Sequence, residues 1–126
     1  MKKIYNTDKA PAPVGPYNQA VAVNGMLYVS GQIAINPETG VLVLEDVQKE
    51  THQVMQNIQA VLAEVGRKFE HVVKASIFIS NMDDFAKINE VYATYFDAET
   101  APARECVEVA RLPKDVNVEI SVLAYL

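Results

Sequence analysis

The chain has very few residues that could form disulfides or bind a transition metal. Its one cysteine, Cys106, cannot form an internal disulfide. The chain has only two histidines, His52 and His71, which are widely spaced, so there is no Cys/His zinc-binding pattern. A single thiol is typical of a reducing compartment, so we expect a cytoplasmic protein. At 126 residues the chain is long enough to fold as a single domain, residues 1–126, without such cross-links.

An excess of positive charge is also missing. Eleven basic residues stand against sixteen acidic ones, which gives a net charge of −5, and the basic residues form no cluster larger than a pair. Contacts to phosphates need a concentrated positive face, so we expect no nucleic-acid partner. The longest apolar runs, such as 122–126, are too short to cross a bilayer, and no secretory signal follows Met1. We therefore expect no membrane partner either.

Local signals for cofactors and covalent catalysis are absent as well. The five glycines are scattered, so no glycine-rich loop is present to hold a phosphate or a dinucleotide. No serine stands in a nucleophile elbow. The two histidines fall on a predicted helix and at the start of a predicted strand, where structural roles are the simpler interpretation. The sequence predicts a protein that needs neither cofactor nor metal.

Hydrophobic periodicity predicts the first half of the fold. Asn24-Gly25 separates two β-rich runs, 19–23 and 26–33, which is a strong hairpin signal because both residues accept a positive φ. Apolar residues then recur at three- and four-residue steps through 47–65, as on one face of a helix. Asp46 can cap the start of this helix and Gly66 can close its end.

The second half of the chain repeats the alternation of strand and helix. Residues 73–80 alternate as in a strand, and a helix follows that begins after Asn81 or Asp83 and carries apolar side chains as far as Phe96. The segment 100–102 ends this helix, and two last strands are predicted at 104–110 and 116–125. The order β-β-α-β-α-β-β predicts an α+β fold with both helices on one face of a mixed sheet.

The sheet face without helices must be covered or solvated. We expect apolar side chains on that face, and subunit contact through it, from the residues Ile77, Ile79, Val107, Val109, Ile120 and Val122.

The last two strands carry the polar residues of most interest. Alternation places Arg104 and Cys106 on one side of their strand, and Glu119 faces away from the apolar side of the next. If the two strands pair antiparallel, these three side chains line one pocket. There the arginine could grip a carboxylate through two hydrogen bonds and the glutamate could hold a water molecule. The alternative is a surface ion pair between Arg104 and Glu119, with Cys106 as a small buried hydrophobe.

Three blocks of sequence carry a family resemblance. They are Gly15–Ala20, then Ser30–Ile33 with Asn36–Gly40, and then Pro102–Asp115. In this order, over essentially the whole chain, they resemble the RidA/YjgF family. The resemblance implies a chorismate-mutase-like α+β fold assembled as a homotrimer, with sites between subunits. It also implies hydrolysis of reactive 2-imino acids, or their enamine tautomers, to 2-oxo acids and ammonia without a cofactor.

The same resemblance implies roles for particular residues. Arg104 would bind the substrate carboxylate, Glu119 would position the attacking water, and Cys106 would line the pocket. Tyr17 would close the cleft from a neighbouring subunit, Ser30 and Gly31 would form its wall, and Asn89 matches a polar position of the family. The chain departs from the family pattern at Glu105, Ala34 and Ala101, which leaves the preferred imine open.

Two other functions stay in competition with the deaminase. The same clefts could hold small carboxylates without turnover, as a binding or chaperone-like trimer. An endoribonuclease or translation inhibitor is the third possibility, since that label is also attached to the family. The net charge of −5 and the missing His/Lys cleavage pair argue against it.

Overall fold

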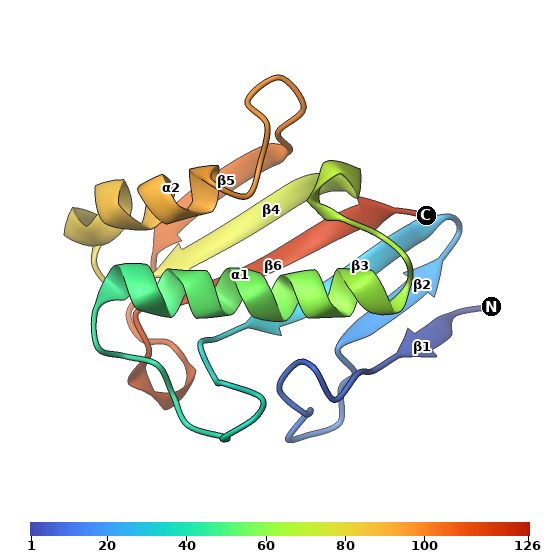
Figure 1. Cartoon of the computed structure of the whole chain (residues 1–126), viewed down its shortest axis with the longest axis horizontal. Helices are drawn as coiled ribbons and strands as arrows, with labels where there is room; N and C mark the ends of the chain where they lie inside the picture. Colours follow the sequence, from blue (N-terminus) through green and yellow to red (C-terminus); the bar gives the residue numbers. More distant parts are fainter.

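The computed structural model describes residues 1–126 and contains one six-stranded mixed sheet with two helices across one of its faces (Figure 1). The sheet order is β1-β2-β3-β6-β4-β5. The strands are β1 Lys3–Tyr5, β2 Ala20–Val23, β3 Met26–Gln32, β4 Val72–Ile79, β5 Ala103–Glu108 and β6 Val118–Tyr125. The helices are α1 Val47–Glu64 and α2 Phe85–Ala93, with short 3₁₀ turns at Phe69–His71, Met82–Asp84 and Pro113–Asp115. No helix has the length and apolar character that crossing a membrane requires.

The predicted hairpin and first helix are confirmed. Asn24 and Gly25 have φ values of 51° and 77° between β2 and β3, as a tight hairpin turn requires. Asp46 accepts a hydrogen bond from the backbone N–H of Lys49 at 2.8 Å and so caps α1. Gly66, with φ of 69°, follows the last turn of α1. Local sequence signals were sufficient for these elements because each depends on residues close together in the chain.

Two element boundaries differ from the prediction. Strand β1 was not expected, because it is three residues long and pairs only with β2 at the edge of the sheet. Helix α2 ends at Ala93 instead of reaching Phe96. The N–H groups of Tyr95 and Phe96 donate to carbonyls three residues back, so both residues lie in a tighter turn. Their rings still pack against Phe69, which preserves the apolar stripe that predicted a longer helix.

The predicted antiparallel pairing of the last two strands is wrong. Strand β4 lies between β5 and β6, pairing parallel with β5 and antiparallel with β6. Helix α2 joins β4 to β5, and a helical crossover of this kind connects parallel strands. Strand β6, the last in the chain, lies between β3 and β4, two strands that come earlier in the sequence.

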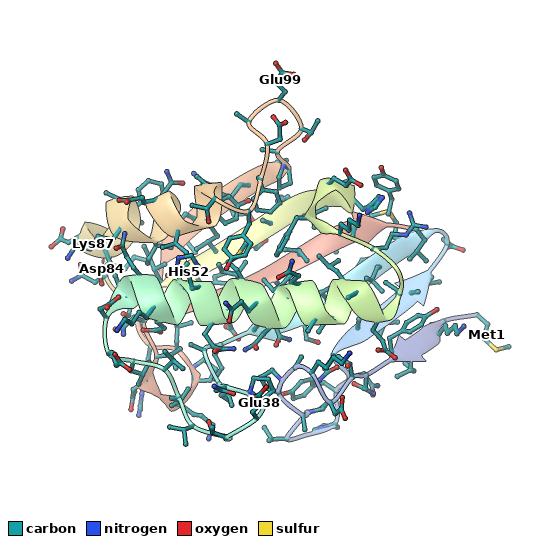
Figure 2. All side chains as sticks on the ribbon, in the orientation of Figure 1. Met1, Glu38, His52, Asp84, Lys87 and Glu99 are labelled. Atoms are coloured by element: carbon teal, nitrogen blue, oxygen red, sulfur yellow. The ribbon has the colours of Figure 1, made fainter.

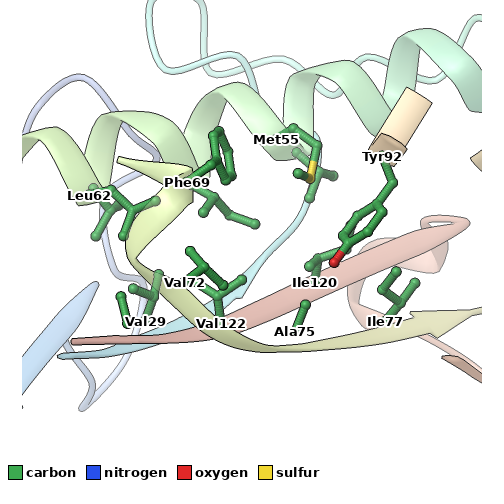
Figure 3. Close-up of a cluster of buried hydrophobic side chains, with 14 of the residues drawn as sticks. Val29, Met55, Leu62, Phe69, Val72, Ala75, Ile77, Tyr92, Ile120 and Val122 are labelled. Carbon is green, nitrogen blue, oxygen red and sulfur yellow. The ribbon is translucent and has the colours of Figure 1, made fainter. Parts of the chain in front are cut away.

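The hydrophobic core lies between the helices and the sheet. Met55 and Leu62 of α1 pack against strand residues of β3, β4 and β6 (Figure 3). Four residues that we expected on the uncovered face belong to this core, namely Ile77, Ile79, Ile120 and Val122. Of the other two expected there, Val107 does lie on the uncovered face, paired beside Phe78, whereas Val109 lies beyond the end of β5. The alternation was correct in period, but the sequence did not show which side the helices cover.

A buried carboxylate joins the first turn of α1 to the start of β6. Glu50 is fully buried, and it accepts hydrogen bonds from the backbone and side-chain N–H groups of Asn117 at 2.8 and 2.7 Å. The backbone N–H of Val118 donates to the same carboxylate at 3.2 Å. The carbonyl of Asn117 in turn accepts from the N–H of Ser80, at the end of β4. A helix and two strands therefore meet at one charged group.

We expect Glu50→Gln to lower the free energy of unfolding by about 3 kcal/mol, because a side-chain NH₂ group would face buried N–H donors. Urea denaturation with circular dichroism measures this change. Glu64→Gln makes the same substitution at an exposed position near the end of α1 and should change stability little. Equal stabilities for the two variants would contradict the assigned role of Glu50.

Candidate functional site

Arg104 lies at the start of β5 with its side chain over α2. It is paired with the buried Ala75 of β4, so it faces the helix side of the sheet. Its Nη1 donates to Oδ1 of Asn89 at 2.5 Å. Its guanidinium carbon lies 5.0 Å from the ring centre of Tyr92 and 5.5 Å from that of Phe85, within the range of cation–π contacts. Two rings and one amide therefore hold the guanidinium in place.

No carboxylate partners this guanidinium within the chain. The four ion pairs of the structure involve other residues, and Asn89 is the one side chain bonded to Arg104. The surface ion pair with Glu119, which was the simpler interpretation of the sequence, is therefore absent. Arg104 presents its remaining N–H donors in a fixed plane, and that geometry suits a bidentate carboxylate ligand.

Cys106 lies next to Arg104 on the same side of β5. It is partly buried and paired with Ile77 of the core. Burial raises the pKa of the Cys106 thiol, and the charge of Arg104 opposes this shift more weakly. The residue is therefore a neutral thiol near neutral pH, which fits a pocket wall and not a nucleophile.

Glu119 lies on the other face of the sheet, against a bulge in β3. It alternates with the buried residues Val118 and Ile120, so its side chain leaves the core. The pairing of β3 with β6 shifts register between Val29 and Gln32. A Cβ atom at Gly31, inside this bulge, would lie 2.7 Å from Oε1 of Glu119. Gly31 does not have a positive φ, so its missing side chain serves the close approach of Glu119.

The Glu119 side chain lines a cavity of about 130 Å³. Lys114, with a left-handed φ of 56°, lines the same cavity. No group of the chain donates a hydrogen bond or forms an ion pair with the Glu119 carboxylate, and burial raises its pKa. A carboxylate in this condition can accept a hydrogen bond from a water or a ligand and can take up its proton. The full lining consists of Pro11, Ala12, Val14, Tyr17, Gln19, Gly31, Gln32, Ile33, Ile35, Pro113, Lys114 and Glu119.

One buried amide holds the loop that forms the cavity wall. The side chain of Gln19 accepts from the N–H of Thr7 at 2.6 Å and donates to the carbonyls of Thr7 and Pro11 at 2.9 and 2.8 Å. Ser30 donates its hydroxyl to the carbonyl of Asn18 at 2.6 Å. Tyr17, between these anchors, is 48% exposed at the cavity. Ser30 does not line the cavity itself, but its hydrogen bond to Asn18 holds the loop that carries Tyr17.

Of the residues that line the cavity, only Tyr17, Gly31 and Glu119 were predicted as site residues, and Gln19 and Lys114 are the polar contributors with the weakest sequence signals. Gln19 was assigned to a strand, and its one signal was a polar residue at the start of an apolar run. Lys114 falls between the last two predicted strands, and its left-handed backbone could not be predicted because lysine rarely adopts that conformation.

The predicted site residues form two groups in one chain. Arg104, Asn89 and Cys106 lie together near α2, and none of them lines the cavity of Glu119, Gly31 and Tyr17. The prediction that Arg104, Cys106 and Glu119 share one pocket within a chain is therefore wrong. Its cause is the position of β4 between β5 and β6. Each group alone contains only some of the residues that were expected to form one site.

Glu105, a departure from the family pattern, faces away from Arg104. Its carboxylate bonds to Nζ of Lys74 at 2.8 Å and accepts from the hydroxyl of Ser76. The hydrogen bond from Lys74 holds the pKa of Glu105 below its usual range, and Ser76 contributes in the same direction. This negative charge is therefore paired with Lys74 on the uncovered face, away from Arg104.

Each histidine makes a hydrogen bond to another residue of the chain at the surface of the fold. His52 points from α1 toward α2 (Figure 2), and its Nδ1 lies 3.0 Å from the hydroxyl of Tyr95. Nδ1 of His71 accepts from the N–H of Lys68 at 3.0 Å. Both agree with the structural roles predicted for them. Nowhere do three His, Cys, Asp or Glu residues gather as ligands for a metal ion.

Gly31→Ala tests the close approach at the bulge. The added methyl group must displace the Glu119 carboxylate, so we expect a loss of about 2 kcal/mol in the free energy of unfolding. In a Glu119→Ala background the methyl group has room, and the same change should cost nothing. A double-mutant cycle measured by urea denaturation gives both values. An equal cost in the two backgrounds would contradict the contact.

Glu119→Gln tests the effect of burial on this carboxyl. Because its folded pKa is raised, the ionised form of Glu119 opposes folding, and its stability contribution is complete only below the unfolded pKa. We expect the variant to melt at a slightly higher temperature than the wild type near neutral pH. The gain should shrink as the pH falls and vanish near pH 3, below the ordinary glutamate pKa, where the carboxyl is protonated in both states. Thermal melts across this range measure it, and a gain that grows in acid would oppose the assigned shift.

Comparisons with known proteins agree with this arrangement of elements. The family model described as Endoribonuclease L-PSP matches residues 7–126. A RutC family protein of Synechocystis is 55% identical over 125 residues, covering 98% of this chain and 96% of the relative. The 2-iminobutanoate/2-iminopropanoate deaminase of Salmonella typhimurium is 44% identical over 126 residues, covering 98% of each.

A solved structure gives the same result in three dimensions. Escherichia coli TdcF, crystallised with bound serine, superimposes with a TM-score of 0.92 at 42% identity, and the match covers 98% of each chain. This similarity bears out the α+β fold class, and the sequence matches span nearly the whole chain. The chain belongs to the RidA/YjgF/RutC family, whose model is the one described as Endoribonuclease L-PSP.

Proposed function

We propose that this protein hydrolyses 2-imino acids, or their enamine tautomers such as those of 2-iminobutanoate and 2-iminopropanoate, to 2-oxo acids and ammonia. The observation that carries the proposal is the Arg104 guanidinium, which Asn89 and two rings hold in place and no carboxylate neutralises. A relative named for this activity, at 44% identity, supports it. The serine in TdcF is a small amino-acid ligand on the same fold, which supports a small carboxylate as the substrate.

The proposal requires an assembly, because Arg104 and Glu119 of one chain belong to separate groups. We propose a homotrimer in which the Arg104 group of one subunit faces the Glu119 cavity of the next. The uncovered face of the sheet supports subunit contact, since Tyr28 and Tyr125 are 47% and 46% exposed there. A cyclic arrangement would repeat one such contact and complete every site in the same way.

The chemistry needs only positioning and one proton acceptor. Arg104 would bind the substrate carboxylate, with Cys106 beside it as a neutral, half-buried wall. Glu119 would hold a water against the carbon of the C=N bond and accept its proton as the C–O bond forms. Returning that proton to nitrogen gives a carbinolamine. Glu119 would then take the proton of the new hydroxyl and pass it to the nitrogen, so that ammonia leaves as the C–N bond breaks and the C=O bond forms. A raised pKa makes Glu119 a better proton acceptor than an exposed carboxylate would be.

The remaining residues would enclose this reaction. Gly31 would allow Glu119 to approach, and Tyr17 would close the cleft from the neighbouring subunit. Ser30 would hold the loop that carries Tyr17. Binding the imine carbon next to an oriented water supplies a proximity effect that dilute solution lacks.

Replacing Arg104 is the direct test. We expect Arg104→Ala to lower kcat/KM by about 100-fold, because a charged hydrogen-bonded anchor is lost. Arg104→Lys keeps the charge but not the planar fork, so it should recover only part of the rate. The assay couples threonine dehydratase to this protein and traps escaping 2-iminobutanoate with semicarbazide.

The matched control removes a cation that lies outside the site. Lys87 is an exposed residue of α2 (Figure 2), and Lys87→Ala should leave the rate unchanged. Trapping with the wild type that equals trapping without the protein would refute the deaminase assignment. Trapping that the wild type and Arg104→Ala reduce equally would refute the role of Arg104.

A binding protein without turnover rests on the same guanidinium. Calorimetric titration with 2-oxobutanoate distinguishes it, since binding that Arg104→Ala abolishes, with no hydrolysis of the imine, would favour that function. The endoribonuclease label of the family model predicts RNA cleavage by the purified protein. A net charge of −5 offers little attraction to RNA phosphates.

A further inference from the structure

A second hollow adjoins the Glu119 cavity. It has a volume of about 430 Å³, against about 130 Å³ for the cavity that holds Glu119. Its lining residues are Pro11, Ala12, Val14, Ile35, Pro37, Gly40, Leu42 and Lys114. The residues that line both spaces are Pro11, Ala12, Val14, Ile35 and Lys114. The two spaces therefore share a wall, and the larger one opens beside the smaller.

The lining of this hollow is apolar apart from Lys114. It contains no acidic side chain, and Val14, Ile35 and Leu42 supply aliphatic surface. A wall of this composition suits an apolar alkyl group of a ligand, because binding there removes the apolar surface of that group from water.

The shape of the hollow is set by backbone hydrogen bonds. Ile35 and Leu42 form an isolated antiparallel bridge, and the N–H of Asn36 donates to the carbonyl of Val41 at 2.9 Å. The N–H of Gly40 donates to the carbonyl of Asn36 at 2.8 Å, closing the turn. Pro37 lies within the turn, and a proline restricts backbone motion. The hollow therefore exists before any ligand binds.

We propose that this hollow, which we call the side-chain groove, accepts the apolar side chain of the substrate. The inference rests on the proposed function, since it takes the imine carbon to lie at Glu119. The protein then prefers 2-imino acids with an apolar side chain longer than that of 2-iminobutanoate. Burial of each added methylene group should raise kcat/KM by about fourfold.

The test compares a short with a long substrate. An amino-acid oxidase generates 2-iminobutanoate from 2-aminobutanoate and 2-iminohexanoate from norleucine, and semicarbazide traps the imine that escapes. We expect kcat/KM for 2-iminohexanoate, which has two more methylene groups, to exceed that for 2-iminobutanoate by about 16-fold in the wild type. The imine made from glutamate carries a side-chain carboxylate that could pair with Lys114. A preference for this imine over 2-iminohexanoate would overturn the apolar assignment.

Leu42→Gln is the diagnostic variant because Leu42 lines the groove but not the Glu119 cavity. The polar side chain of similar length should lower kcat/KM for 2-iminohexanoate toward the value for 2-iminobutanoate, with a much smaller loss on the shorter imine. Val41→Gln is the matched control, since Val41 is the adjacent residue, is 62% exposed and does not line the groove. Circular dichroism verifies that both variants fold.

The outcomes separate this inference from the proposed function. Equal rates on the two imines in the wild type, or an equal loss on both in Leu42→Gln, would overturn the groove while leaving the deaminase intact. If no imine is hydrolysed, the deaminase fails, and calorimetry with 2-oxobutanoate and 2-oxohexanoate then tests the groove alone. Tighter binding of the longer acid, lost in Leu42→Gln, supports the groove, and equal affinities overturn it.

Discussion

The buried carboxylate of Glu50 is the contact on which the arrangement of this protein depends. Burying a charge is unfavourable unless hydrogen bonds compensate it, and here Asn117 and Val118 supply three. These donors stand at the entrance to β6, the strand that lies between β3 and β4 and carries Glu119. The first turn of α1 therefore sets where β6 begins, and through it where the candidate proton acceptor lies.

The two charged groups of the candidate site lack the compensation that Glu50 has. Glu119 is half-buried against Gly31 without a donor, and Arg104 rests on Phe85 and Tyr92 without a carboxylate. A half-buried carboxylate without a donor costs stability, and such costs are concentrated at sites that bind or react. Glu50, through its contacts to Asn117 and Val118, and Glu119, the second residue of β6, both lie at the start of that strand, yet their surroundings suit them to different tasks.

Sheet order has the largest consequence for function. Because α2 carries the chain across to a parallel β5, Arg104 faces the helices while Glu119 faces the opposite side. The two groups would meet only if a second copy brought its own Arg104 to this cavity. The proposed side-chain groove lies on the Glu119 side of that division, next to the loop that Gln19 holds. Under the proposed function, selection for the length of the substrate side chain and binding of the substrate carboxylate thus fall to different parts of the fold.

The sequence by itself determined the hairpin at Asn24-Gly25, the helix capped by Asp46 and the alternation within each strand, because each depends on neighbours in the chain. It also determined the family, through motifs that keep their order. Only the tertiary structure decided that β4 separates β5 from β6, that Ile77 faces the helices, and that Lys114 lines the Glu119 cavity. Alternation states which side chains share a side of one strand, but pairing with distant strands decides what lies on that side.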